Sequence, residues 1–247
     1  MEAGTTGGSM EALTRVLVIG HGRMGQLVER LAPEHRCEIA GIIRRGDTIT
    51  AATRPDVAID FSTGAAAASN LVALGNAGIS VVIGTTGWNV PEGELRRLAE
   101  TFRIGVLASA NFDVGLHIFR QAVAHAAAQF AGQPGYRAWI HEVHHMHKKD
   151  APSGTALLLK DTMARAGYPR EIAVTSERVG EVPGTHTVGF DGQADSVAFT
   201  HTVHDRAVFA RGALDVARWL HGRRGWFSMD DFLEARSTWR HVLTGPE

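Results

Sequence analysis

The pattern of apolar and polar positions changes character near the middle of the chain. In the first part, short apolar runs at 16–19, 57–61, 80–83 and 104–108 are suited to strands buried on both faces. A further strand is predicted over 38–43, and helical spacing over 24–31, 65–77 and 91–102. This alternation of strands and helices with short links predicts an α/β fold with a doubly wound parallel sheet.

A different arrangement is predicted after Asn111. Residues 114–130 indicate a long Ala-rich helix, and 137–143 a strand. Segments 171–179, 184–190 and 195–203 are typical of antiparallel strands with Gly-rich turns, and helical spacing returns over 209–220. We therefore expect a nucleotide-binding part followed by a mixed α+β part.

Composition and charge exclude several classes of protein. The 247 residues are 44% hydrophobic and 21% charged, as in ordinary globular domains, with a net charge of −1. Neither nucleic acid nor a membrane is expected as a partner, because the chain lacks a basic excess and an apolar run of ~20 residues. The lone Cys37 excludes an internal disulfide and favours the cytoplasm. Residues 1–14 lack the features of a signal peptide and are expected to form a loose tail.

The motif Gly20-x-Gly22-x-x-Gly25 directly follows the first predicted strand and opens the first helix. The first glycine permits a tight turn, the second lets backbone amides approach a pyrophosphate, and the third allows close helix–strand packing. The motif alone is weak, because 28 residues are glycine, but its context favours a dinucleotide site. The alternative is an ordinary strand–helix turn.

Arg44 and Arg45 end the second predicted strand, where NAD-binding sites usually carry a carboxylate for the ribose hydroxyl. Guanidinium groups suit a 2′-phosphate, so we predict that NADPH is preferred and that NADH is a possible second cofactor. The alternative is two solvated arginines.

The side chains best suited to proton transfer and anion binding are concentrated in residues 141–155. Four histidines and two lysines lie within nine residues and lead into Pro152-Ser153-Gly154-Thr155, which precedes a predicted helix over 156–164. Imidazoles exchange protons near neutral pH, and the free amides of a first helical turn, capped by Ser153 or Asp150, favour a carboxylate. The segment predicts a site that binds a small carboxylate and protonates it, the alternative being a solvated basic loop.

The same segment contains His141-Glu142-Val143-His144-His145, the letters of the zinc-protease motif H-E-x-x-H. That chemistry requires a helix, whereas 137–143 is predicted to be a strand, in which the two histidines would lie ~13 Å apart. We therefore expect no metal site.

Residues 142–156 resemble the signature of the dihydrodipicolinate reductase family, also named 4-hydroxy-tetrahydrodipicolinate reductases. Further segments match in the same order over about 16–233: 22–25, 59–62, 84–87, 110–112 with 114–115, 184–187, His201, Arg206, 209–214 and 219–220. The resemblance implies a Rossmann-type domain over 15–112 and 207–247. It also implies a central substrate domain over 113–206, whose open mixed sheet pairs with its copies in a homotetramer.

The implied activity is NAD(P)H-dependent reduction of a cyclic imine dicarboxylate to tetrahydrodipicolinate in lysine and diaminopimelate biosynthesis. By position, His144 would be the proton donor and acceptor and Lys148 the second proton donor, while His145, Gly154 and Thr155 would hold a substrate carboxylate. Besides Arg44 and Arg45, the residues implied at the cofactor are Gly20, His21, Gly22, Arg23, Met24, Gly25, Gly84, Thr85, Thr86, Ser109, Ala110, Asn111 and Phe112.

The chain departs from the family pattern in three places. The segment between Arg45 and Val57 is short, the link from Arg178 to Gly184 is also short, and Arg44 stands where an acidic residue is expected. Two other functions stay open: a related imine reductase or amino-acid dehydrogenase, and a sensor that binds NADPH without turnover.

Overall fold

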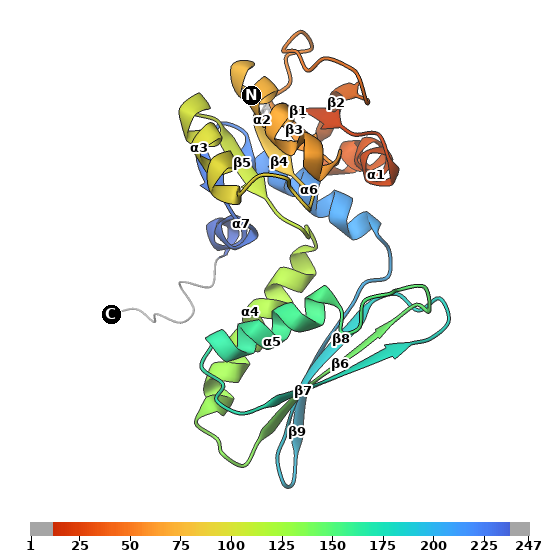
Figure 1. Cartoon of the computed structure of the whole chain (residues 1–247), viewed down its shortest axis with the longest axis vertical. Coiled ribbons are helices and arrows are strands. Elements are labelled where there is room, and N and C mark those ends of the chain that lie inside the picture. The colour runs from red at the N-terminus through yellow and green to blue at the C-terminus, as the bar shows by residue number, and fades with distance from the viewer. Residues whose placement is uncertain (1–11, 238–247) are drawn as a thin grey trace, which may run out of the picture. The chain divides into compact units, whose positions relative to one another are not determined.

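The computed structural model describes residues 12–237, which fall into two compact units (Figure 1). The first unit ends at Phe112 and resumes over Phe209–Arg236, and the second is Asp113–Val208. Residues 1–11 of the predicted tail and 238–247 of the predicted first domain lie outside the described residues.

The first unit is built on a six-stranded sheet in which every pair of neighbours is parallel. Its order is β10-β5-β4-β3-β1-β2, and the strands are β1 (Thr14–Ile19), β2 (Cys37–Ile43), β3 (Val57–Asp60), β4 (Ser80–Ile83), β5 (Gly105–Ala108) and β10 (Gly225–Phe227). Because β1 lies between β2 and β3, the direction in which strands are added reverses there. The carboxyl ends of β1 and β3 form the switch point at which such sheets bind ligands.

Helices bury both faces of this sheet, which explains its continuous apolar strands. They are α1 (Arg23–Leu31), α2 (Ala67–Asn76), α3 (Glu92–Phe102), α6 (Ala207–Leu220) and α7 (Met229–Arg236), with short 3₁₀ turns η1 (Ala32–His35) and η2 (Gly64–Ala66). Leu71 and Leu95 pack against Leu17 and Val81 in one core cluster. The predicted doubly wound fold is confirmed, although β10 and α7 were not foreseen. Three residues are too few for a strand to show periodicity.

The segment after Arg45 is short, and as a result residues 44–56 form a loop without a helix or strand. Arg15 of β1 holds this loop instead, donating from Nε to the Arg54 carbonyl (3.0 Å) and from Nη2 to that of Thr53 (2.8 Å). Ile49 of the loop packs against the core in place of a crossover helix.

The second unit contains a mixed four-stranded sheet in the order β7-β6-β8-β9. The strands are β6 (Arg137–His144), β7 (Ile172–Arg178), β8 (Thr185–Asp191) and β9 (Ser196–Thr202). β8 is antiparallel to both β6 and β9, as predicted, but the prediction for 171–179 was wrong because β7 runs parallel to β6. Helix α5 (Gly154–Arg165) lies between them in sequence and returns the chain, which makes a parallel crossover.

One face of this sheet packs on α5 and on α4 (Val114–Ala131). Phe119, Leu159 and Met163 of these helices form a buried cluster with Ile140 and Val188 of the strands. Side chains of the alternate positions, such as Trp139 and Thr200, point to the other face, so the predicted open sheet is confirmed. Over residues 12–237, no helix has both the length and the apolar character needed to cross a membrane.

Candidate active site

The glycine motif forms the turn between β1 and α1. Gly20 has φ +87°, a conformation that favours glycine, and a Cβ on Gly25 would lie 2.1 Å from the Gly20 carbonyl oxygen. Gly22 is the N-cap of α1, and a Cβ there would have nothing within 4 Å. The turn therefore leaves the start of α1 open on one side, as close approach of an anion requires.

A cavity of about 350 Å³ lies beside this turn, at the switch point of the sheet. It is lined by residues that follow β1, β3 and β4, namely Gly22, Arg23, Met24, Phe61, Ser62, Thr63, Gly64, Gly84, Thr85 and Thr86. The predicted segments 22–24 and 84–86 are thus brought together. Residues 61–64 were not assigned to the cofactor from the sequence, although 59–62 was one of the matching segments.

Buried hydrogen bonds hold residues 61–64, the part of the cavity wall that was not predicted from the sequence. The Asp60 carboxylate at the end of β3 accepts hydrogen bonds from the Ser62 amide (2.8 Å) and from Asn70 Nδ2 (2.9 Å). Burial raises the pKa of Asp60, and these hydrogen bonds oppose the rise. A Cβ on Gly84 would lie 2.0 Å from the Phe61 ring, so glycine there lets this ring pack closely against the turn after β4.

The predicted segment 109–112 follows β5 but does not line this cavity. Ser109 Oγ donates to the Asn111 carbonyl (2.6 Å), which tightens the turn. Phe112 is 1% exposed, packs edge-on to Phe61, and leaves room only for glycine at position 212. The observed contacts of Phe112 are those of a core residue.

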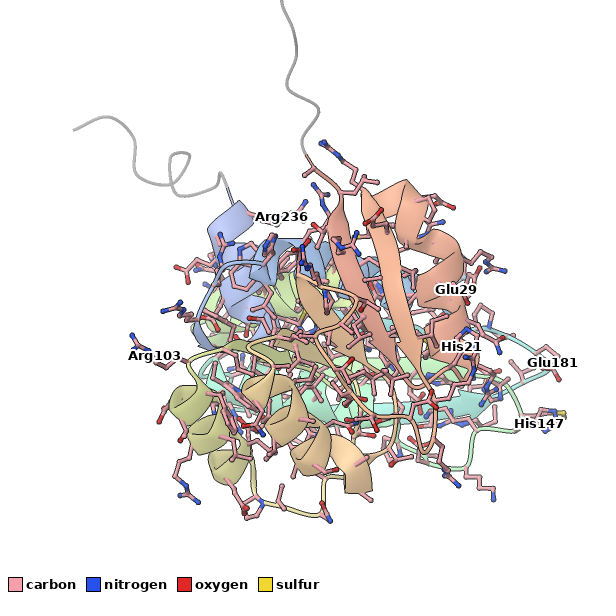
Figure 2. The ribbon with its side chains drawn as sticks, turned by 90° about the horizontal axis from the view of Figure 1, so that it is seen from above. His21, Glu29, Arg103, His147, Glu181 and Arg236 are labelled. Carbon is pink, nitrogen blue, oxygen red and sulfur yellow. The ribbon has the colours of Figure 1, made fainter. Side chains whose placement is uncertain are left out.

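The arginine pair lies just past β2. Arg44 Nη2 is 3.5 Å from His21 Nδ1, and His21 Nε2 is 2.6 Å from Glu29 of α1 (Figure 2). One guanidinium group, that of Arg44, therefore lies beside the glycine turn, and both arginines are exposed.

In the second unit, Glu142 and His144 are two residues apart on β6, so their side chains share one face of the strand. Glu142 Oε2 contacts His144 Nδ1. His141 points to the opposite face, where its Nδ1 is 2.9 Å from Thr175 Oγ1. The predicted strand is confirmed, so these residues do not form the helix that a zinc-protease motif requires.

The Glu142 side chain is fully buried and tightly held. Its Oε1 accepts hydrogen bonds from Arg178 Nη2 (2.8 Å) and from the Ser153 amide (3.2 Å). Burial alone would raise the pKa of Glu142, but Arg178, Ser176, His144 and Ser153 together lower it to about 2. The carboxylate is therefore ionised at neutral pH.

His144 carries a proton less readily than a free histidine. Burial lowers its pKa, the Glu142 carboxylate opposes this, and the nearby cations Lys148 and Arg178 lower it further. At neutral pH the imidazole is therefore uncharged in the free protein, with one nitrogen protonated.

Lys148 and Asp150 form an ion pair in the loop after β6, with Nζ 2.7 and 2.8 Å from the two carboxylate oxygens. The Arg178 guanidinium also donates to the backbone carbonyls of Lys148 and Asp150. Arg178 thus connects the Glu142 carboxylate to the loop that carries the lysine.

The start of α5 closes the site. Ser153 caps this helix, its Oγ accepting from the Ala156 amide (3.1 Å), and Gly154 and Thr155 form the first turn as predicted. Nδ1 of His145 is buried and has no hydrogen-bond partner in the part of the chain that the structure describes. A positive helix end and an unsatisfied imidazole nitrogen are groups that a carboxylate ligand can use.

His186 of β8 was not predicted as a site residue. It lies opposite Glu142 in the strand pairing, 3.0 Å from Ser153 Oγ, and burial lowers its pKa to about 4. Donor atoms of Glu142, His144 and His186 lie within 4.8 Å of one another, a spacing that metal sites also use. The Arg178 guanidinium on the same carboxylate already supplies positive charge there. Of the residues missed, Glu142 and His186 lie inside the matching segments, whereas Arg178 gave no signal.

Known proteins match along nearly the whole described chain. Residues 14–112 match the family model "Dihydrodipicolinate reductase, N-terminus", and residues 115–233 match "Dihydrodipicolinate reductase, C-terminus". A 4-hydroxy-tetrahydrodipicolinate reductase of Christiangramia forsetii is 32% identical over 233 residues, covering 88% of this chain and 97% of the relative. One of Archaeoglobus fulgidus is 35% identical over 261 residues, covering 89% and 100%.

A solved structure agrees in fold. The dipicolinate-bound dihydrodipicolinate reductase of Paenisporosarcina sp. TG-14 aligns with a TM-score of 0.72 at 22% identity, covering 87% of this chain and 97% of that one. The resemblance inferred from the sequence motifs is thereby confirmed. Two family models end to end, and relatives matched over almost their full length, show that the chain belongs to the dihydrodipicolinate reductase family.

Proposed function

We propose that this protein catalyses the NAD(P)H-dependent reduction of 4-hydroxy-tetrahydrodipicolinate to tetrahydrodipicolinate, a step of lysine and diaminopimelate biosynthesis. The observation that carries the proposal is the His144 imidazole, held by the buried Glu142 carboxylate, beside Lys148 and the start of α5. These groups suit an anionic substrate that must gain a proton.

The first unit fits a dinucleotide, because Gly22 leaves the start of α1 open and a cavity adjoins it. Residues 22–24, 61–64 and 84–86 would hold the cofactor, which supplies hydride when bound. We further propose a preference for NADPH, supported by the Arg44 guanidinium beside His21, since guanidinium groups bind phosphate with charge-assisted hydrogen bonds.

In the second unit, His145 and the first-turn amides of Gly154 and Thr155 would bind a substrate carboxylate. His145 contributes its buried, unsatisfied Nδ1, and α5 contributes its positive end. Asp150 holds Lys148 in the free protein, so a bound carboxylate would compete with Asp150 for this ammonium group.

Proton delivery is assigned to His144 and Lys148. Hydride addition to a double bond conjugated with nitrogen leaves negative charge, which cationic donors stabilise and then neutralise. His144 is uncharged when free, and a bound dianionic substrate would raise its proton affinity by charge attraction.

The decisive assay follows NADPH oxidation with substrate generated in the cuvette from pyruvate and aspartate semialdehyde by the preceding synthase. His144→Ala and Lys148→Ala should each lower kcat by ~10²- to 10⁴-fold while NADPH still binds. His147→Ala is the matched control, because His147 is an exposed histidine in the same loop, 3.3 Å from Glu181 (Figure 2). Unchanged rates in the first two variants would refute their roles. NADPH binding without oxidation in the unmutated protein would refute the activity.

We also propose that copies of the chain pair through the open face of the four-stranded sheet as a cytoplasmic homotetramer. That face carries small and hydroxyl side chains in register, such as Thr187 and Thr200, whose hydroxyls are 3.0 Å apart. Sedimentation equilibrium should give four times the chain mass, and Thr200→Arg should reduce it. A monomer at micromolar concentration would contradict the assembly.

A further inference from the structure

We propose that Glu142 is a positioning residue that fixes the tautomer of His144 in the free protein, with the proton on Nδ1. Nε2 is then the nitrogen that takes up a proton from solvent when the anionic substrate binds and donates that proton to the substrate. The catalytic half of this inference rests on the proposed function, because it takes His144 as the proton donor. The tautomer itself is a property of the free protein.

The first observation is the isolation of the Glu142–His144 contact. Glu142 Oε2 and His144 Nδ1 are both buried, and neither has another hydrogen-bond partner within residues 12–237. An ionised carboxylate can only accept hydrogen bonds, so a neutral His144 satisfies both atoms only when Nδ1 carries the proton.

The second observation is that the carboxylate cannot turn away. Its other oxygen, Oε1, is held by Arg178 Nη2 (2.8 Å) and by the Ser153 amide (3.2 Å), both of which are donors. Two donors on Oε1 fix the plane of the carboxyl group, and the Ser176 side chain is a further hydrogen-bond donor to the same carboxylate. Oε2 faces the imidazole. Arg178 also keeps Glu142 ionised, which a fixed acceptor requires.

The third observation concerns the opposite nitrogen. A Cβ on Gly184 would lie 2.9 Å from His144 Nε2 and 3.1 Å from Cδ2, and Cβ atoms in proteins rarely come so close to a neighbouring side chain. Glycine at this position therefore leaves the Nε2 edge of the ring uncovered. The His186 ring lies edge-on to the His144 ring, with 5.0 Å between the ring centroids. Nε2 of His186 contacts Ser153 Oγ, so His186 does not compete for Nε2 of His144.

These contacts make a sharp prediction for Glu142→Gln. Arg178 and Ser153 both donate to position ε1, so the amide oxygen should occupy that position and the NH₂ group should face His144 Nδ1. An amide NH₂ donates, so Nδ1 would become the acceptor and the proton would move to Nε2. The substitution should invert the tautomer while preserving shape.

The matched control is Glu181→Gln. Glu181 Oε1 lies 3.3 Å from His147 Nε2, and both side chains are exposed. This variant removes a carboxylate next to a histidine of the adjoining loop without touching His144. It should leave both the tautomer of His144 and the rate unchanged.

The test measures the ¹⁵N chemical shifts of His144 in histidine-labelled free protein near pH 7.5, together with kcat and KM. The unmutated protein should show Nδ1–H, Glu142→Gln should show Nε2–H, and its kcat should fall ~10²-fold or more with little change in KM. Gly184→Ala should keep Nδ1–H but lower kcat by about 10-fold or more, because the methyl group blocks Nε2. An Nε2–H tautomer in the unmutated protein overturns the proposal even if no variant folds.

Two further results separate this inference from the proposed function. Retention of kcat within about 2-fold in Glu142→Gln would overturn the positioning role while the reductase activity stood. An inactive unmutated protein whose tautomer still inverts in Glu142→Gln would refute the proposed function and support the assignment of the proton to Nδ1.

Discussion

Two glycines of one motif, Gly25 and Gly22, should respond differently to the same added methyl group, Gly25 by losing stability and Gly22 by losing affinity for the cofactor. A Cβ on Gly25 would lie 2.1 Å from the Gly20 carbonyl oxygen and 3.3 Å from Val18 Cγ1. The first contact is with backbone and cannot be relieved by rotating a side chain. A Cβ on Gly22 would touch nothing within 4 Å.

The expected magnitudes follow from these contacts. Alanine gains about 0.5–1 kcal/mol over glycine inside a helix, which favours Gly25→Ala. Overpacking costs about 1–3 kcal/mol, and a contact more than an ångström too short belongs at the upper end of that range. We expect Gly25→Ala to lower the free energy of unfolding by about 2 kcal/mol, the overpacking cost less the helical gain. Gly22→Ala should change it by only about 0.5 kcal/mol, because glycine is a slightly better N-cap than alanine.

Cofactor binding should discriminate between the two variants as well. Gly22 lines the cavity, so its methyl group would stand where backbone amides must approach a phosphate. We expect Gly22→Ala to fold normally and to bind NADPH about 10-fold more weakly, a loss of ~1.4 kcal/mol. Urea unfolding and NADPH fluorescence titration measure the two effects. Equal stability of the two variants would refute the packing role of Gly25, and unchanged NADPH affinity in Gly22→Ala would refute the role of Gly22.

Three further predictions concern the cofactor, acid stability and metal. Arg44→Ala with Arg45→Ala should lower kcat/KM for NADPH by about 10-fold and leave that for NADH unchanged, whereas equal losses with both cofactors would contradict phosphate recognition. The pKa of His186 falls from 6.5 to about 4 on folding, so as pH falls from 6.5 to 4 the unfolded chain takes up a proton that the folded chain does not. Folding therefore loses up to ~3 kcal/mol over that window. His186→Gln should remove this part of the pH dependence in urea unfolding, and an unaltered pH dependence would argue against it. Dialysis against a chelator should leave the rate unchanged, and a loss restored by zinc would show that Glu142, His144 and His186 hold a metal ion.

The parallel sheet was predictable because its strands are buried on both faces. Strands buried on both faces are apolar at every position, so runs such as 16–19 and 80–83 can be recognised from the sequence alone. The direction of β7 was not predictable in the same way, because Ile172–Arg178 shows the alternation of a half-buried strand whether its partner is parallel or antiparallel. The helix between β6 and β7 was itself predicted, and counting it as a crossover would have given the correct direction.

The candidate site also has a part that could be predicted from the sequence and a part that could not. Residues 141–155 are contiguous, so their chemistry could be recognised as a density of histidines and lysines followed by a helix start. The groups that hold them come from elsewhere: Arg178 lies opposite His144 in the β6–β7 pairing, and His186 lies opposite Glu142 in the β6–β8 pairing. Strand register sets these neighbours, and register depends on the whole sheet.

Ser153 shows why the local motif and the distant residues act as one unit. Its hydroxyl caps α5 and contacts His186, while its amide donates to Glu142. The proposed carboxylate site at the helix start and the His144 imidazole on β6 are therefore joined through a single residue. A shift of α5 that improved contact with a substrate carboxylate would also move a donor on the Glu142 carboxylate, and with it the orientation of His144. Substrate binding and proton delivery are for this reason expected to be coupled, so that Ser153→Ala should change both KM and kcat.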